Sequence, residues 1–280
     1  DYMNINEVRK DLAKQVETYI KLIKQEYGQY IPEEVLIRLE NITNYEEIIK
    51  IYDYGSINAY ADYNAINMPL CADKILTIAS KVPGYGISKN SRPYNDNNIV
   101  INNNTFLTYI KHVFISGTNA EGYYSDLLLH ETMHFCGSGG AGVIQEGINE
   151  LLTRMLAQKY GLRTNSCGYP KEVKLAYDLM QAFGEEIVIQ MAFIRDPIEQ
   201  ISFLEKKLGS EAAEFYDSIF YEADIEFMSK YYSKIDKFSG ITGIAKKVLF
   251  YNKLDYSRVH EQIKQYILSK TNKTPANIKK

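Results

Sequence analysis

The sequence predicts a mostly helical α+β protein in which a small β-sheet precedes the main group of helices. Apolar residues recur at helical spacing along most of the 280 residues, and turn-forming residues concentrate in one stretch before residue 123. Hydrophobic residues make up 45% of the chain, which is enough for a sizeable core. We expect a single domain over residues 1–280, with a helical N-terminal part at 1–83 and a helical C-terminal subdomain at 168–280.

The N-terminal part begins with a strong helical pattern. Apolar side chains from Ile5 to Tyr27 alternate with charged ones at helix spacing, and Gly28 ends the pattern. Pro32 then opens a second, short helix, because its fixed φ suits the first helical turn. Two further helices are predicted at 45–52 and 70–80.

The pattern changes after these helices. Residues 84–98 are rich in Gly, Asn, Ser and Pro and are predicted to form a loop. The segment NIVI at 98–101 is the best strand candidate, and the turn-forming residues at 102–104 keep it short. Residues 106–114 fit a helix or a strand. The predicted sheet therefore lies upstream of residue 123.

Helical patterns return from residue 123 onward. Ser125 or Asp126 can cap a helix that ends near Phe135. The segment CGSGGAG at 136–142 is a tight glycine-rich turn, and a strong helix follows at 143–160. The later predicted helices cover residues 171–183, 185–194, 197–208, 210–232, 241–250 and 256–269.

Composition and charge exclude several classes of function. The net charge of −3, from 32 basic and 35 acidic residues, does not fit a protein that binds nucleic acid. No run of eighteen apolar residues is present, so we expect no transmembrane segment. The odd number of three cysteines favours free buried thiols and leaves one disulfide bridge as the alternative. The absence of a start Met favours an extracellular or surface-anchored protein that has lost a leader or lipid anchor, and a cytoplasmic location stays open.

The strongest chemical signal is LLLHETMHFCG at residues 127–137. His130 and His134 are four residues apart, so both imidazoles leave one helix face and can bind a zinc ion at ~2.0–2.1 Å. Glu131 lies on the neighbouring stripe, where it can deprotonate a water without binding the metal. The helix is otherwise apolar, and burying these three side chains there would be costly without a cation. The pattern therefore predicts Zn²⁺ as the cofactor.

Two histidines leave a catalytic zinc site one protein ligand short. The next predicted helix carries Glu146 and Glu150, which are again four residues apart on one face. Beside a zinc–histidine cluster, one carboxylate can bind the metal while the other accepts an N–H from a ligating histidine. The alternative is an ordinary solvated helix face.

HETMH followed by QEGINELLTR resembles the gluzincin families of zinc metallopeptidases. QEG is similar to the NEG segment of the aminopeptidase-like branch, which implies Glu146 as the metal ligand and Glu150 as the support of a histidine. Matching INE to the same letters in thermolysin-like enzymes implies Glu150 as the ligand instead. The resemblance covers residues 123–160. The spacer at 135–145 is shorter than in these families, and the glycine-rich turn can allow so short a reversal. If it does not, Glu150 or a more distant glutamate is the ligand.

The resemblance implies a zincin-like catalytic domain and a zinc-dependent peptidase. Glu131 would deprotonate a zinc-bound water, which attacks the peptide carbonyl, and would then protonate the leaving amine. Tyr169 is the candidate for stabilising the oxyanion, although an aromatic residue at a helix start also explains it. The families also use a strand edge to align an extended substrate, and 98–101 is the candidate, with a purely structural strand as the equal alternative.

The sequence leaves the substrate open between a protein, a short peptide and a peptidoglycan crosslink. It also leaves two other classes of function open. One is a non-catalytic protein in which a structural zinc clamps two helices, and the intact Glu131 speaks against it. The other is a metal-free helical binding or surface protein in which HETMH occurs by chance.

Overall fold

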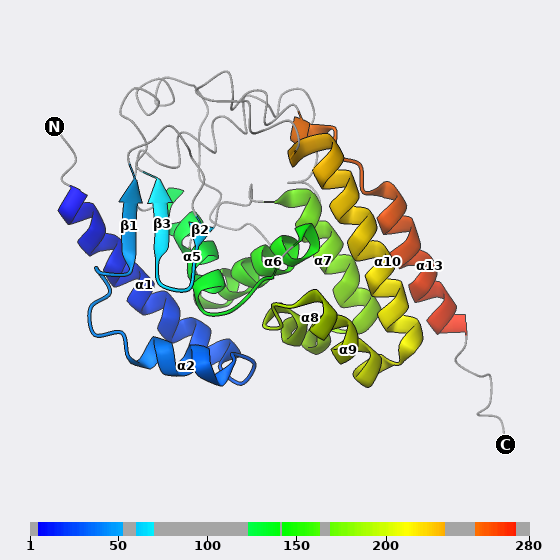
Figure 1. Cartoon of the computed structure of the whole chain (residues 1–280), viewed down its shortest axis with the longest axis horizontal. Helices are drawn as coiled ribbons and strands as arrows, with labels where there is room; N and C mark the ends of the chain where they lie inside the picture. Colours follow the sequence, from blue (N-terminus) through cyan, green and yellow to red (C-terminus); the bar gives the residue numbers. More distant parts are fainter. Residues whose placement is uncertain are drawn as a thin grey trace.

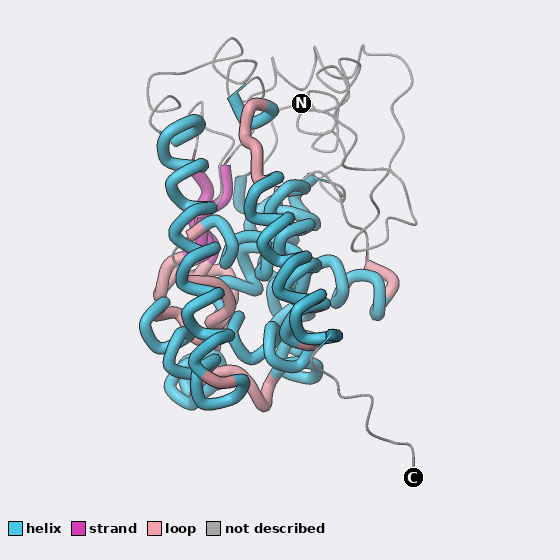
Figure 2. The backbone as a smooth tube through the Cα atoms, turned by 90° about the vertical axis from the view of Figure 1, so that its right-hand side faces the viewer, coloured by secondary structure: helices cyan, strands magenta, loops and turns pink. Residues whose placement is uncertain are grey.

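The computed structural model describes residues 5–52, 60–69, 123–140, 142–162, 169–232 and 250–272. Within these residues the protein is mostly helical with one small three-stranded sheet, so the predicted fold class is confirmed. Figure 2 shows the helices and the group of short strands. None of the described helices combines the length and apolar character that a membrane span requires.

The N-terminal helices form where the sequence predicts them. α1 (Ile5–Tyr27) is amphipathic and buries one face, and this face contacts α5 and β1. Pro32 is the N-cap residue of α2 (Glu33–Glu40). Arg38 of α2 donates hydrogen bonds to the backbone carbonyls of Tyr63 and Phe135. α2 is thereby tied to the C-terminal end of α5.

Three short strands form the sheet in the order β1-β3-β2. β1 (Ile49–Tyr52) runs parallel to β3 (Ile66–Pro69), whereas β2 (Tyr60–Ala61) runs antiparallel to it. Ile49 pairs with Ile66, and both side chains are buried. Both β2 and β3 contact α5 (Figure 1). The sheet therefore lies against this helix, with β3 in its centre and β1 and β2 at its two edges.

The helix predicted at 45–52 is wrong. Residues 45–48 form a turn and β1 follows it. The sequence IKIY alternates apolar and charged residues with the period of a strand, and the backbone of β1 is satisfied by pairing with β3. That partner lies well over a dozen residues downstream, beyond the reach of a local helical pattern. The segments predicted at 70–80, 84–98, 98–101 and 106–114 lie outside the described residues.

α5 (Tyr123–Phe135) and α6 (Val143–Tyr160) occupy the middle of the molecule (Figure 1). α5 begins at Tyr123, so Ser125 and Asp126 lie inside the helix and do not cap it, which corrects the predicted start. α6 has the predicted bounds. α6 contacts α5 on one side and α7 (Pro170–Phe183) on the other. The two central helices thus join the N-terminal part to the C-terminal helices.

The remaining helices form a layer beyond α6 (Figure 1). The helix predicted at 210–232 is continuous but changes to a π-helix over its last turn. Cys136 is free and buried, as predicted, whereas Cys71 and Cys167 lie outside the described residues. The helices after α7 are α8 (Glu185–Ala192), α9 (Pro197–Leu208), α10 (Ser210–Phe227), η2 (Met228–Tyr232) and α13 (Ser257–Asn272).

Candidate metal centre

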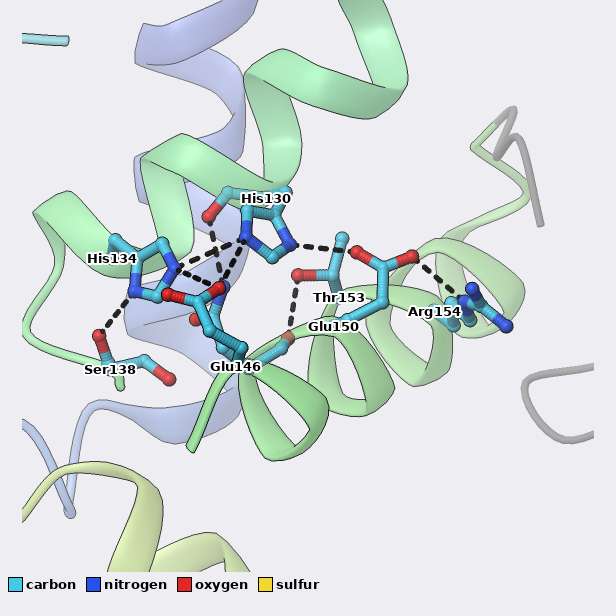
Figure 3. Close-up of polar contacts among 8 residues, drawn as sticks. His130, His134, Ser138, Glu146, Glu150, Thr153 and Arg154 are labelled. Carbon is cyan, nitrogen blue, oxygen red and sulfur yellow. Dashed lines mark hydrogen bonds and ion pairs between the residues drawn. The ribbon is translucent and has the colours of Figure 1, made fainter. Parts of the chain in front are cut away.

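α5 presents His130 and His134 from one face, one turn apart (Figure 3). Their Nε2 atoms lie 3.1 Å apart, and the two rings meet edge to face. Glu146 reaches the same point from the first turn of α6. Its Oε2 atom lies 3.4 Å from Nε2 of His130 and 3.3 Å from Nε2 of His134. Two helices therefore bring three metal-ligand atoms into one small triangle.

The triangle has the size that a zinc ion requires. Ligand atoms at about 2.0–2.1 Å from a tetrahedral zinc are about 3.3 Å from one another. The three measured separations, from 3.1 to 3.4 Å, match this edge length. The side chain of Glu146 is 33% exposed, so the cluster is open to solvent on its side. The three candidate ligand atoms are therefore spaced as a zinc ion would require, and they line a cavity that is open on the Glu146 side.

The Nδ1 atoms of both histidines face hydrogen-bond acceptors. Nδ1 of His130 lies 2.7 Å from Oε2 of Glu150, and Nδ1 of His134 lies 3.0 Å from the carbonyl oxygen of Ser138. These acceptors assign the proton of each neutral imidazole to Nδ1, so each Nε2 carries a lone pair. Two nitrogen lone pairs and a carboxylate oxygen therefore converge on one point, an arrangement that a cation stabilises.

The charges around the cluster favour a cation at this point. Burial lowers the pKa of His130, but the hydrogen bonds that its protonated ring donates to Glu146 and Glu150 outweigh this effect and raise the pKa well above 6.5. Burial raises the pKa of Glu146, yet the hydrogen bonds that its carboxylate accepts from both histidine rings bring that pKa far below the usual value. Both shifts show that the site stabilises positive charge beside an ionised carboxylate.

Glu150 has a different position from Glu146. It lies one turn further along α6, where its Oε2 accepts from His130 and its Oε1 accepts from Nε of Arg154 at 2.8 Å. Glu150 and Arg154 are both nearly fully buried. Of the two glutamates that the sequence left open, Glu146 lies at the Nε2 atoms and Glu150 lies behind His130, where it orients the ring.

The glycine-rich turn accommodates the short link between α5 and α6. Gly139 has a φ of +74°, and a Cβ atom there would lie 2.5 Å from Cε1 of His134. Its N–H donates to the carbonyl oxygen of Ala192 at the end of α8. Gly140 is equally confined, because its Cβ would lie 2.3 Å from the carbonyl oxygen of Arg195. The absence of side chains lets the turn pass between His134 and the α8–α9 loop.

Glu131 lies beside the cluster, and its carboxylate is not one of the three candidate ligand groups. It is 5% exposed, and its carboxylate accepts a hydrogen bond from the backbone N–H of Ala61 in β2. Burial raises the pKa of Glu131, while the nearby His130 and His134 partly oppose this shift. A buried carboxylate with a raised pKa, next to a candidate metal site, has the properties that a general base requires.

Tyr169 stacks on His130, with ring centroids 5.5 Å apart and an interplanar angle of 21°. It is the N-cap residue of α7, and its φ of 49° is the only positive φ of a non-glycine residue in the described part of the chain. Such backbone strain in a bulky residue is unusual and concentrates at functional sites. The charge of Glu146 and burial raise the pKa of its hydroxyl, so Tyr169 is a neutral hydrogen-bond donor.

A cavity of about 360 Å³ joins these groups. It is lined by the three ligand side chains and by Glu131 and Tyr169, together with the additional residues Tyr60, Ala61, Gly139, Gly140 and Arg195. The structure thus brings every candidate residue of the sequence to one cavity except Glu150, which lies behind His130. The cavity opens beside β2, so the strand edge at the site belongs to residues 60–61, whereas 98–101 lies outside the described residues.

The sequence did not single out four of the contributors. Arg154 was visible as the basic residue four positions after Glu150, a spacing that pairs opposite charges on a helix. Ser138 acts through its backbone carbonyl, Ala61 through its backbone N–H, and Arg195 comes from a distant loop. No sequence pattern marks these three.

In comparisons with known proteins, no family model, curated protein or solved structure matches the chain.

Proposed function

We propose that this protein is a zinc-dependent peptidase of the gluzincin type. The observation that carries the proposal is the convergence of the Nε2 atoms of both histidines and the Glu146 carboxylate at the wall of a cavity that also holds Glu131. His130, His134 and Glu146 hold the metal. Glu150 and the carbonyl of Ser138 orient the two imidazoles through their Nδ1 protons.

The chemistry is the hydrolysis of a peptide bond. A bound zinc ion lowers the pKa of water and polarises the carbonyl of the substrate. Glu131 takes the proton of the attacking water, and the remaining hydroxyl group forms the new bond to the carbonyl carbon. The C–N bond then breaks, and Glu131 returns the proton to the leaving amine. Tyr169 donates a hydrogen bond to the oxygen that becomes negatively charged.

A structural zinc site is the second candidate, because the ligands join two helices that also carry much of the core. A structural site is closed by four protein ligands, whereas a catalytic site has three and an open position. Only three candidate ligands meet among the described residues, and they line an open cavity. This difference favours catalysis over a purely structural metal. A metal-free binding protein is the third candidate, and zinc content separates it from the other two.

The first experiment is elemental analysis of the purified chain and of Glu146→Ala, Glu150→Ala and Glu131→Gln. We expect about one zinc per native chain, loss of zinc in Glu146→Ala, weakened retention in Glu150→Ala and full retention in Glu131→Gln. Cleavage of a mixed peptide pool, followed by mass spectrometry, then compares the native chain with Glu131→Gln. We expect hydrolysis by the native chain alone.

Each result separates the candidates. Absence of zinc, even after zinc is added and the excess removed, would leave a metal-free helical binding protein. Zinc retention with no cleavage of any peptide would favour the structural site. Equal zinc content in the native chain and Glu146→Ala would contradict the ligand assignment.

A further inference from the structure

Among the described residues that line the candidate cavity, one is an arginine and none is a lysine. Arg195 lies in the loop between α8 and α9, is exposed, and lines the cavity together with Glu131 and Glu146. Within the described part of the chain, its guanidinium has no hydrogen-bond or ion-pair partner, and its charge acts on Arg38, which is another cation. An exposed arginine that lines a cavity and has no such partner can bind a ligand that enters it.

The loop holds Arg195 in a fixed place. Ile194, immediately before it, accepts a hydrogen bond from the buried side chain of Gln200 through its carbonyl oxygen. Asp196, immediately after it, caps α9 by accepting from the N–H of Ile198 at 2.7 Å. The backbone of Arg195 itself packs against Gly140. Because the backbone is held on both sides, little loop ordering is needed when the guanidinium binds a ligand.

The charges of the cavity fit an anionic group. With the proposed divalent ion bound, the two histidines would be neutral ligands and the ion would balance the carboxylates of Glu131 and Glu146. Arg195 would then add one positive charge to the cavity wall. A guanidinium binds a carboxylate through two parallel hydrogen bonds, a geometry that matches its planar fork.

We propose that Arg195 binds a carboxylate of the substrate and thereby selects which peptides enter the cavity. The carboxylate is either the C-terminus of the peptide or an acidic side chain near the cleaved bond. This inference rests on the proposed peptidase function and names its substrate class. Arg195 acts as a specificity-determining residue and takes no part in proton transfer.

The test uses the full-length, zinc-loaded Glu131→Gln chain, which binds peptides without cleaving them. Binding of matched pools of acetylated hexapeptides to this chain is compared in two ways. The first comparison is between peptides with free and with amidated C-termini, and the second is between peptides that contain Asp and Glu and peptides that contain Asn and Gln instead. For the peptides retained best, the dissociation constants of acid and amide forms are measured by calorimetry. Arg195→Met tests the guanidinium, and Arg258→Met, which removes an exposed arginine of α13, is the matched control.

We expect the acid form to bind about 10- to 100-fold more tightly than its amide, the usual range for a hydrogen-bonded charge pair. Arg195→Met should remove this difference by weakening the acid form alone, and Arg258→Met should preserve it. If affinity is lost when the peptide is amidated, the C-terminal carboxylate is the group that Arg195 binds. If affinity is lost when Glu in the peptide is exchanged for Gln, the group is an acidic side chain. All three chains should hold equal amounts of zinc.

Two results would overturn the inference, and they differ in what else they overturn. Equal affinity for acid and amide forms, or an Arg195→Met variant that weakens both alike, would reject the role of Arg195 and leave the peptidase proposal intact. Failure of every pool to bind, together with no peptide cleavage by the native chain, would reject the peptidase proposal and this inference with it.

Discussion

His130 and Glu150 are joined by a buried contact of 2.7 Å between Nδ1 and Oε2, and the other oxygen of Glu150 contacts Arg154. The contact couples the two central helices, because His130 belongs to α5 and Glu150 to α6. It also fixes the tautomer of His130, so that Nε2 faces Nε2 of His134. The orientation of the proposed ligand His130 thus depends on Glu150, which lies outside the proposed ligand set.

Glu150→Gln should lower zinc affinity by about 10- to 100-fold, the usual effect of removing a carboxylate that supports a ligating histidine. The amide can keep the hydrogen bond but loses the charge that makes the imidazole a stronger ligand. Competition with a zinc-binding dye measures the change. Glu146→Gln is the comparison, and it should cost more because it removes a ligand. A larger loss in Glu150→Gln than in Glu146→Gln would reverse the two assigned roles.

Arg154→Met should destabilise the zinc-free protein by up to about 3 kcal/mol, because it removes one of the two buried partners of the Glu150 carboxylate and leaves only His130. Both side chains are only 5% exposed or less, so solvent cannot replace the lost partner. Urea unfolding followed by circular dichroism measures the free energy of unfolding. Lys21→Met removes an exposed ion pair of the same spacing and should change stability by less than about 1 kcal/mol. Equal losses in the two variants would contradict this account.

Gly139→Ala should weaken zinc binding, since the new methyl group meets the ring of His134 at 2.5 Å. Gly161→Ala is the matched control: Gly161 also has a positive φ, of 65°, but no atom lies within 4 Å of the position of its Cβ. Both variants should lose about 1–2 kcal/mol of stability from left-handed backbone strain. Only Gly139→Ala should lose zinc affinity, and unchanged zinc binding in it would show that the ring has room to move.

Tyr169→Phe should lower kcat for peptide hydrolysis by about 10²–10³-fold, the usual effect of removing one oxyanion donor. KM should change little, because the hydroxyl acts on charge that develops only in the transition state. Zinc content should equal that of the native chain. Steady-state kinetics on a cleaved peptide measures both constants, with the exposed Tyr221→Phe as control. A change confined to KM would assign Tyr169 to substrate binding instead.

Stability should fall at alkaline pH through the buried tyrosines around Glu172. Tyr251 and Tyr256 donate hydrogen bonds to its carboxylate, and burial raises their pKa values above the ordinary 10.0. A pKa that is raised in the folded state contributes stability that is complete below the unfolded value. This stability is lost as the pH rises from the unfolded pKa toward the folded pKa, because the tyrosines of the unfolded chain ionise first.

Urea unfolding at about pH 8 and about pH 11 tests this dependence. Tyr256→Phe removes one of the buried ionisable groups, so its free energy of unfolding should fall less between the two pH values than that of the native chain. The exposed Tyr221→Phe should behave like the native chain. A steeper fall in Tyr256→Phe would show that the sign of the linkage is opposite.

The local patterns of the sequence were sufficient for the helices and for part of the candidate site. α1 and α6 have their predicted bounds, because long amphipathic periods and clear glycine or proline ends specify a helix locally. The i, i+4 spacings of the two histidines and of the two glutamates likewise determine which side chains share a helix face. These relationships lie within single helices, so the sequence could determine them.

The tertiary structure decided how segments that are distant in the sequence lie relative to one another. β1 is a strand because it pairs with β3, and no pattern within 45–52 reveals that partner. The roles of Glu146 and Glu150 follow from how α6 packs on α5, a choice between two residues one turn apart on the same face. Ala61 and Arg195 reach the cavity from a distant strand and loop. Long-range packing fixes such positions, since distances between elements depend on the whole core and not on the spacing of residues within one segment.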